Sequence, residues 1–483
     1  MIQIIAAIFA ILISVVVFFK KPRKFPPGPP AIPFFGSVFF VPHLPGLIAT
    51  AATWFINRYH SKIVGLYLGR FPIVAIYDFE VAKEIFSRDD LTGRPDNVLY
   101  RFRTNGKNQG LMFADGNSWK SHRRFSLKTL RDFGFGKSSL ESVLIEEADR
   151  MGEFFLSQKD EPFLVQTLFN LVILNVLWTI VAGKRYELSD PKAQGIVRLI
   201  TESVQVENLR FLFNMPWVRY LFPQASGWNT QKKIIGDLRD LVGGLVDEHK
   251  SNFDTSDMRD FMDVYLREMD GRTEFNEEAL IVTAMDLFAA GSETTATTLS
   301  WAVLYMILYP DVQAKVYKEI SEVLGDREPT LEDRSSLPYT DACIMEIQRL
   351  GSIAPMAVPH RALKDVEVKG YRIPKDTLVF SVLYHILRDP DYWPDPNAFK
   401  PERFLTPDGS QVIKEERFIP FGVGKRYCLG ESLAKAELFI ILTRLLQKFS
   451  FHSAPGHPVP SDQPVFGFIY APKPFHAVTK ARQ

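Results

Sequence analysis

The feature of this sequence that most constrains its fold is a helical segment of about 30 residues without a proline. Asn276 is a preferred N-cap residue, Glu277 and Glu278 follow it in the first turn, and the next proline is Pro310. At about 1.5 Å per residue the predicted helix is roughly 45 Å long. Apolar residues cover most of its faces, among them Leu280, Met285, Phe288, Leu299 and Trp301. A helix of this kind is buried, so we expect it to pass through the centre of a domain.

The middle of this helix carries a glycine, an acid and hydroxyl groups in the run Ala289-Ala290-Gly291-Ser292-Glu293-Thr294-Thr295. Glycine inside a helix costs about 1 kcal/mol relative to alanine, and a buried carboxylate costs more unless it is paired. Together they predict a local widening with room for a small ligand beside the acid–alcohol pair. A solvated polar stripe is the alternative, which the apolar flanks on both sides disfavour.

Short strand-like runs lie towards both ends of the chain. Two come early, at residues 63–68 and 73–77, and two come late, at residues 366–368 and 378–380. The sequence between them has mostly helical character. This order predicts a mainly α body with a small β-region to which both ends of the chain contribute.

The two cysteines, Cys343 and Cys428, exclude several classes of protein. Two cysteines do not make a disulfide framework. Without a Cys-x-x-Cys pair, neither a zinc ribbon nor an iron–sulfur cluster is expected. A disulfide between the two is a weaker alternative, because Cys343 lies on the apolar side of a predicted helix and is expected to act as a small hydrophobic residue.

Cys428 follows a glycine-rich segment, Phe421-Gly422-Val423-Gly424-Lys425-Arg426-Tyr427, and a predicted helix begins shortly after it. Glycines permit a tight loop. At a helix N-terminus, backbone N–H groups and the helix dipole stabilise a thiolate. A thiolate is the form of cysteine that binds iron and favours O–O cleavage there. Taken alone, the segment is equally compatible with a structural cysteine in a turn.

Five segments together resemble the cytochrome P450 family. Residues 421–430 match its haem-binding signature at every defining position, and residues 290–295 are similar to its oxygen-activating helix. Residues 346–349 resemble its Glu-x-x-Arg pair, residues 401–404 the partner segment downstream, and residues 119–123 its Trp-x-x-x-Arg motif. The resemblance covers the whole chain and implies the mainly helical fold of that family, with a small β-region.

The resemblance also implies a site. Cys428 is the expected metal ligand, bound to the haem iron. The other expected cofactor-binding residues hold the haem propionates or contact the haem: Arg94, Trp119, Arg123, Ala290, His360, Phe421, Arg426 and Gly430. Glu293 and Thr294 are the expected catalytic residues, organising the water chain that supplies protons for oxygen activation. The side chains of Glu346, Arg349 and Arg403 are expected to form a buried structural salt-bridge triad.

The N-terminus predicts a membrane anchor. Residues 1–19 are almost wholly apolar, and Lys20, Lys21, Arg23 and Lys24 follow at once. A transmembrane helix needs roughly 20 apolar residues, and positive charge on this side places the body in the cytosol. A cleaved signal peptide is the less favoured alternative, since its charges would come first. We predict an anchor at 1–19 in the endoplasmic reticulum membrane, a basic, proline-rich spacer at 20–30, and a haem-thiolate domain at 31–483.

The charge balance and the resemblance together predict the partners. Because 57 Lys and Arg stand against 56 Asp and Glu, the chain lacks the basic excess of a nucleic-acid binder. The resemblance implies a monooxygenase that receives electrons from NADPH through NADPH–cytochrome P450 reductase, with cytochrome b5 as a second candidate partner. Five basic residues are expected near the cysteine side of the haem, where they form either a docking face or ordinary solvated surface: Lys120, Arg124, Lys128, Lys425 and Lys435.

The substrate is expected to be apolar. Within the family, residues 130–137 resemble arthropod members of the animal microsomal group most closely. The segments expected to line the pocket are 98–113, 209–213, 353–358 and 466–469. These features predict an endogenous steroid or sesquiterpenoid hormone precursor. The alternatives are a broad-specificity monooxygenase that oxidises xenobiotics, a haem protein that rearranges oxidised lipids without O2, and a non-catalytic lipid carrier.

Overall fold

A computed structural model describes residues 21–32, 35–42, 46–135, 138–166, 168–204 and 217–482. The predicted anchor at 1–19 and the predicted pocket segment at 209–213 lie outside the described residues. Among the residues that are described, no helix is long and apolar enough to span a membrane.

Helices make up most of the described chain. Those of the first half are α2 (Leu47–Thr50), α3 (Ala52–Tyr59), α4 (Phe79–Phe86), α5 (Val98–Arg103), α6 (Gly116–Asp132), α7 (Glu141–Ser157), α8 (Asn170–Ala182), α9 (Pro191–Val204) and α11 (Val218–Leu221). Those that follow are α12 (Trp228–Ser251), α13 (Phe261–Glu268), α14 (Glu277–Leu308), α15 (Pro310–Leu324), α16 (Pro338–Gly351), α17 (Leu383–Ile386) and α18 (Glu431–Lys448). Short 3-10 turns are η1 (Val38–Phe40), η2 (Asp89–Leu91), η3 (Ser138–Leu140), η4 (Leu331–Ser336) and η5 (Pro401–Phe404).

The strands form small sheets. They are β1 (Ile63–Leu68), β2 (Phe71–Ile76), β3 (Phe163–Leu164), β4 (His360–Arg361), β5 (Val366–Val368), β6 (Tyr371–Ile373), β7 (Leu378–Ser381), β8 (Phe449–Ser453), β9 (Pro464–Val465), β10 (Ala471–Pro472) and β11 (His476–Ala481). One sheet has the order β1-β2-β7-β4, in which β2 and β7 are parallel and the other pairs antiparallel. Strands from both ends of the chain therefore share a sheet, as predicted. The other sheets are β3-β11-β8, β10-β9 and β5-β6.

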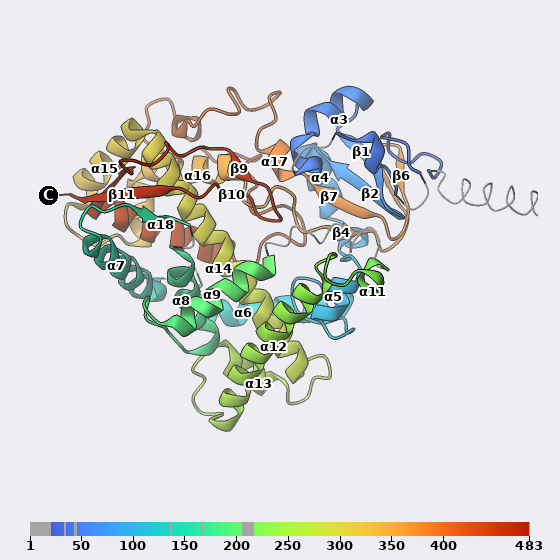
Figure 1. Cartoon of the computed structure of the whole chain (residues 1–483), viewed down its shortest axis with the longest axis horizontal. Helices are drawn as coiled ribbons and strands as arrows, with labels where there is room; N and C mark the ends of the chain where they lie inside the picture. The colour runs from blue at the N-terminus through green and yellow to red at the C-terminus, as the bar shows by residue number, and fades with distance from the viewer. Residues whose placement is uncertain are drawn as a thin grey trace, which may run out of the picture.

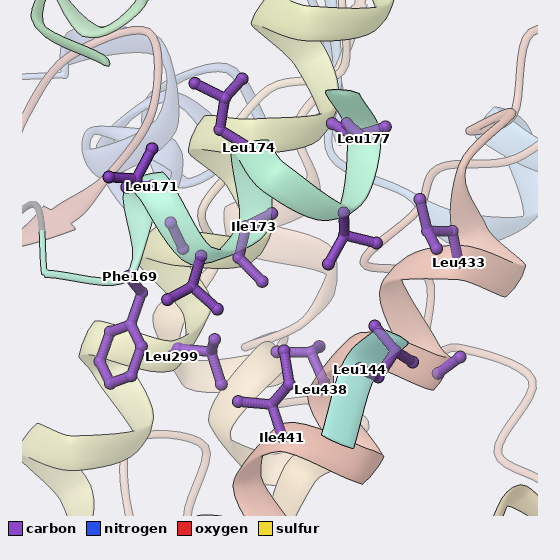
Figure 2. Close-up of a cluster of buried hydrophobic side chains, with 14 of the residues drawn as sticks. Leu144, Phe169, Leu171, Ile173, Leu174, Leu177, Leu299, Leu433, Leu438 and Ile441 are labelled. Carbon is purple, nitrogen blue, oxygen red and sulfur yellow. The ribbon is translucent and has the colours of Figure 1, made fainter. Parts of the chain in front are cut away.

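The central helix is α14, which is 32 residues long. The side chain of Asn276 accepts a hydrogen bond from the backbone N–H of Ala279 and caps it, as predicted. The helix α14 packs against α8, α12, α16 and α18. Figure 1 shows it crossing the helical body, while the sheet with β1 and β2 lies at the other end of the molecule beside α3 and α4. In Figure 2, leucine and isoleucine side chains of α8 and α18 meet Leu299 of α14.

Gly291 is explained by the approach of α8 to α14. A Cβ at this position would lie 2.5 Å from Cδ1 of Leu177 on α8. The glycine therefore permits close helix packing, and it also lines a cavity beside Thr294, where the sequence predicted room for a ligand.

Part of the predicted spacer packs against β1. The backbone N–H of Gly65 donates to the carbonyl oxygen of Pro27 over 2.9 Å, and Nζ of Lys21 donates to the Gly65 carbonyl, also over 2.9 Å. Phe25 is buried, and a Cβ at Gly28 would lie 2.0 Å from the Gly65 carbonyl oxygen. The packed body thus begins within residues 20–30.

A buried salt-bridge triad joins α16 to η5. Nε of Arg349 lies 2.7 Å from Oε2 of Glu346, and Nε of Arg403 lies 3.0 Å from Oε1 of the same carboxylate. Glu346 and Arg349 are fully buried. Nη1 of Arg349 also donates to the carbonyls of Leu387 and Pro396. The predicted triad is confirmed, and it ties α16 to the segment that precedes the cysteine loop. Both cysteines are free thiols, and Cys343 is buried in the core, so the alternative disulfide is excluded.

We predict that Glu346→Gln destabilises the protein by about 3–5 kcal/mol, because it leaves two buried guanidinium groups without their counterion. The free energy of unfolding in denaturant measures this. The matched control is Glu322→Gln, which breaks the exposed i,i+4 pair with Lys318 and should change stability by about 0.5 kcal/mol or less. Equal stability of Glu346→Gln and this control would contradict the structural role of the triad.

Candidate functional site

A cavity of about 1980 Å³ lies between α14 and the loop of residues 421–430. Three of the four predicted pocket segments contribute to its wall, namely 98–113, 353–358 and 466–469. The lining is largely apolar, with Phe113, Met356 and Phe466 among its members. The structure therefore brings together segments that are far apart in the sequence.

Cys428 faces this cavity from the loop that precedes α18. The loop is held by two backbone hydrogen bonds, from the N–H of Cys428 to the Phe421 carbonyl and from the N–H of Lys425 to the Phe86 carbonyl, both 3.0 Å long. Gly424 has a φ of 81°, and a Cβ there would lie 2.2 Å from the Phe86 carbonyl oxygen. The turn thus requires glycine at this position.

The sulfur of Cys428 lies in a mixed electrostatic environment. Burial raises the pKa of the thiol, and the negative charge of Glu431 acts in the same direction. The backbone N–H groups of Gly430 and Glu431 donate to the sulfur and, with Arg123, oppose this rise. The contacts expected at a helix N-terminus are present, but burial outweighs them. A cation at the sulfur would favour the thiolate.

Three arginines gather at one edge of the cavity. Arg94 donates through Nη1 to the carbonyls of Val358 and Pro359 over 3.0 and 3.1 Å. The guanidinium of Arg426 lies 3.7 Å from the ring centroid of Trp119. In the described part of the chain, the guanidinium groups of Arg94, Arg123 and Arg426 form no ion pair and donate to backbone carbonyls instead.

These cations destabilise one another. Burial, together with the positive charges of Arg94 and Arg123, lowers the pKa of Arg426 to about 7, and the carboxylate of Asp115 opposes this shift. Burial is also the main cause that lowers the pKa of Arg94, to about 10. Buried cations demand anions. A cofactor that carries carboxylates would satisfy this demand.

His360 lies buried beside the arginines. Its Nδ1 hydrogen-bonds with the Leu91 carbonyl, so the nitrogen carries a proton there. Burial lowers the pKa of His360 well below its usual value, and the charges of Arg94 and Arg426 add to the effect. The neutral ring then has no second N–H to donate. It can donate to a carboxylate only as imidazolium, which a nearby anion favours.

Thr294 and Glu293 lie on different sides of α14. Thr294 lines the main cavity, and its hydroxyl donates to the Ala290 carbonyl over 2.8 Å. Glu293 is buried, and its Oε2 accepts from Nδ2 of Asn170 over 2.7 Å and from Oγ1 of Thr201 over 2.9 Å. Glu293 lines a second, smaller cavity of about 90 Å³. Adjacent residues on a helix point about 100° apart, and here that turn separates the acid from the alcohol.

The other predicted cofactor contacts, Ala290, Phe421 and Gly430, also line the main cavity. Three of the five basic residues of the predicted docking face form ion pairs within the described part of the chain. Lys120 and Lys425 lie 3.8 and 2.7 Å from Oδ1 of Asp89, and Lys435 lies 2.6 Å from Oε1 of Glu431.

Two acids of the cavity wall were missed in the sequence. Asp286 on α14 lies 3.0 Å from Nη2 of Arg103 and accepts from the N–H groups of Leu111 and Met112, both over 2.9 Å, so it fixes a loop of the wall. Glu437 on α18 is buried and lines the cavity. A charge inside an otherwise apolar stretch of helix was the available signal for Asp286, as it was for Glu293, whereas α18 carries several other charges and gave no such signal for Glu437.

These residues fit a haem. A cysteine with access to the cavity can ligate iron, the unpaired arginines can hold two carboxylates, and the apolar walls suit a flat aromatic ring system. The glycine that lets the cysteine loop turn against Phe86 shapes this side of the cavity.

Known proteins match nearly the whole chain. The family model described as Cytochrome P450 matches residues 26–478. Farnesoate epoxidase from Bombyx mori is 34% identical over 95% of this chain and 94% of its own length. Cytochrome P450 2J3 from Rattus norvegicus is 38% identical over 93% of this chain and 90% of its own length. Cytochrome P450 2L1 from Panulirus argus is 34% identical over 96% of each. The resemblance stated from the sequence is confirmed.

We predict that Arg426→Gln weakens haem binding about 10- to 100-fold, as expected for the loss of a charge-assisted hydrogen bond worth about 1.5–3 kcal/mol. The substitution removes repulsion with Arg94 and Arg123 but also the hydrogen bonds to the carbonyls of Thr92, Leu111 and Ala114, so the haem-free protein should lose less stability than the haem-loaded protein. Haem titration and thermal unfolding with and without haem measure the two effects.

The control for this prediction is Arg372→Gln, which breaks an exposed ion pair with Asp365 and should leave haem affinity unchanged. A loss of stability in Arg426→Gln that is as large without haem as with haem would contradict the view that this cation serves a bound anion.

Proposed function

The chain belongs to the cytochrome P450 family, and on that premise we propose that it is a membrane-bound monooxygenase with Cys428 as the axial ligand of its haem iron. Thiolate-ligated haem and a redox partner that supplies electrons are properties of the family. The observation that carries the proposal is the position of Cys428, which faces a large cavity across from the glycine and threonines of α14.

When bound, the haem supplies the redox chemistry by which one atom of O2 enters the substrate and the other leaves as water, with two electrons and two protons consumed. The chain's own residues hold the group and its surroundings. Arg94, Arg123 and Arg426 are proposed to bind the propionates, together with Trp119 and protonated His360. The largely apolar walls lower the local dielectric constant, which strengthens each of these charge interactions.

Glu293 and Thr294 are proposed to hold and transfer protons on different sides of α14. The Thr294 hydroxyl lines the main cavity, where it can hold and orient a water. Glu293 lines the smaller cavity, whose wall also contains Thr297 and Ser300 from the same face of the helix. A proton held at the Glu293 carboxyl therefore has to pass around α14, through water, to reach the Thr294 hydroxyl.

The electrons are proposed to come from NADPH through NADPH–cytochrome P450 reductase, with cytochrome b5 as a second donor. The face around Lys120, Arg124, Lys128, Lys425 and Lys435 is the proposed docking surface. Electrostatic complementarity of this kind mainly raises the rate of association with an acidic partner.

We place the protein in the endoplasmic reticulum membrane, with residues 1–19 as a single-pass anchor and the catalytic domain in the cytosol. The apolar run and the basic residues that follow it support this orientation. A second membrane contact is proposed at α11, where four large apolar residues are more than half exposed: Trp217, Tyr220, Leu221 and Phe222.

The substrate is proposed to be an apolar hormone precursor of steroid or sesquiterpenoid size. The apolar wall supports this, since each Å² of buried apolar surface contributes about 25 cal/mol. The relative from Bombyx mori is named for the epoxidation of farnesoate. A monooxygenase can carry out either hydroxylation or epoxidation. Broad oxidation of xenobiotics is the alternative, followed by rearrangement of oxidised lipids without O2.

We predict that Cys428→Ala abolishes the red-shifted Soret band that a thiolate-ligated haem gives when it is reduced under carbon monoxide. No second sulfur replaces it, because Cys343 is buried on another helix. Cys343→Ala is the matched control and should keep the band. A red-shifted band in Cys428→Ala would show that the axial ligand has been assigned wrongly.

We predict that the purified protein gives substrate-type spectral shifts with one chemical class at low concentration in a panel of steroids, sesquiterpenoids, fatty acids and drugs. NADPH-dependent oxygen consumption in the presence of reductase should follow the same class. Weak shifts spread over the whole panel would favour the xenobiotic alternative, and product formation without oxygen uptake would favour the lipid-rearranging one.

A further inference from the structure

Gln231 is a buried polar residue in the wall of the main cavity that the proposed roles leave unused. It lies in the first turn of α12, and only 3% of it is exposed. Ile234 and Ile235 share its face of the helix, because residues three and four positions apart are neighbours there, and both line the cavity as well. The amide of Gln231 therefore stands beside two apolar side chains in this wall.

The buried Nε2 of Gln231 forms no hydrogen bond within the described part of the chain. Gln313 shows the contrast, since it is also buried but its Nε2 donates to the carbonyls of Met306 and Phe451, and its Oε1 accepts from the N–H of Phe451. A buried N–H group without a partner costs free energy, so such groups are few in folded proteins and each needs an explanation. A molecule in the cavity that carries an acceptor would supply the missing bond.

Two other amide or hydroxyl side chains of the cavity wall, those of Asn97 and Ser381, also have a buried polar atom without a partner among the described residues. Asn97 has a structural task, because its Oδ1 caps α5 by accepting from the N–H groups of Leu99 and Tyr100, both over 3.0 Å. Ser381 belongs to β7, which lies in the sheet and apart from α12 (Figure 1). Gln231 is therefore the residue that marks the α12 side of the cavity.

The arginines beside α12 indicate that the ligand group bound there is neutral. Arg239 of α12 donates to the carbonyl of Arg103 over 3.1 Å, so the two lie together. Both are already paired, Arg239 with Glu278 and Arg103 with Asp286. A carboxylate beside Gln231 would find neither cation free, and a buried charge without a counterion is costlier than a buried neutral carbonyl. The site thus fits an ester or a ketone.

The cavity is large enough for a haem and a long second molecule. Its volume of about 1980 Å³ exceeds the roughly 300–1,000 Å³ that is typical of a ligand pocket. Cys428 reaches the cavity from the loop before α18, whereas Gln231 reaches it from α12, and Figure 1 shows these helices in different parts of the helical body. A group bound at Gln231 can therefore hold one end of a molecule while another part of it approaches Cys428.

We propose that Gln231 is a specificity-determining residue, whose side-chain N–H donates to a neutral carbonyl oxygen at the end of the substrate remote from the haem. The proposal rests on the monooxygenase function and narrows its substrate class to apolar molecules that carry an ester or a ketone. The hydrogen bond determines which carbon atoms face Cys428. It also selects against an otherwise identical hydrocarbon, which leaves the amide unpaired.

The test compares the affinity of the haem-loaded wild type and of Gln231→Met for pairs of probes, by equilibrium dialysis. One pair is a sesquiterpenoid methyl ester and its parent hydrocarbon, and the other is a steroid ketone and its deoxy analogue. Methionine keeps the length of glutamine and lacks the donor. The substitution should weaken binding of a carbonyl probe about 3- to 10-fold, the effect of one lost hydrogen bond. The matching hydrocarbon should bind no more weakly than before, because the unpaired amide is gone.

The carboxylate that corresponds to the methyl ester tests the charge preference, and the wild type should bind it more weakly than the ester. Asn229→Leu is the matched control. Asn229 carries the same kind of amide in the same turn of α12, but it is exposed and is not among the described residues that line the cavity. This variant should leave every dissociation constant unchanged. If Gln231→Met does not fold, Gln231→Leu replaces it. Equal weakening of carbonyl and hydrocarbon probes, weakening of neither, or tighter binding of the carboxylate than of the ester overturns the proposal.

The second measurement is the distribution of oxidised positions on the carbonyl probe. In the wild type one position remote from the carbonyl should dominate, and Asn229→Leu should keep this pattern. In Gln231→Met oxidation should spread over several positions, because the remote end is no longer held. Identical distributions in wild type and Gln231→Met overturn the proposal. Failure of the monooxygenase function is distinguishable, since no probe would then give product while dialysis would still decide the role of Gln231.

Discussion

The structure depends on the burial of most of α14. A helix without a solvated face must be covered on every side, and α8, α12, α16 and α18 provide this cover. Every polar group on it therefore needs a partner or a purpose inside the protein. Asp286 is satisfied by an arginine and two backbone amides, Glu293 by an amide and a hydroxyl, and the hydroxyl of Thr294 by its own helix. The two cavities lie where the cover is incomplete.

Features that a short stretch of chain determines could be predicted from the sequence. The cap at Asn276, the strands at both ends, the loop before α18 and the Glu346 triad follow from local propensity or from motif resemblance. The positions of the buried acids could not be predicted, because they depend on which helices pack against one another. The sequence places Glu293 next to Thr294, but only the packing of α8 and α9 shows that the acid is held on the far side. The sequence does not show that Glu437 lines the cavity, because this position depends on the packing of α18 against α14.

The arginines at the cavity edge show how a binding site opposes folding. Arg94, Arg123 and Arg426 repel one another, and the nearest carboxylate, Asp115, is shared with Arg361. The folded chain therefore carries uncompensated charge that a bound dianion would neutralise. Ligand binding then contributes directly to the stability of the folded state. This coupling explains why the three arginines can be tolerated close together in a region that is otherwise apolar.

The contact between Gly28 and Gly65 has a mechanical consequence. Because the chain before β1 is clamped to the sheet by the hydrogen bonds of Pro27 and Lys21, it leaves the body in one direction and cannot swivel there. The chain at Lys21 therefore has a fixed orientation relative to the sheet, and the cavity faces in a fixed direction relative to the point where the chain leaves the body.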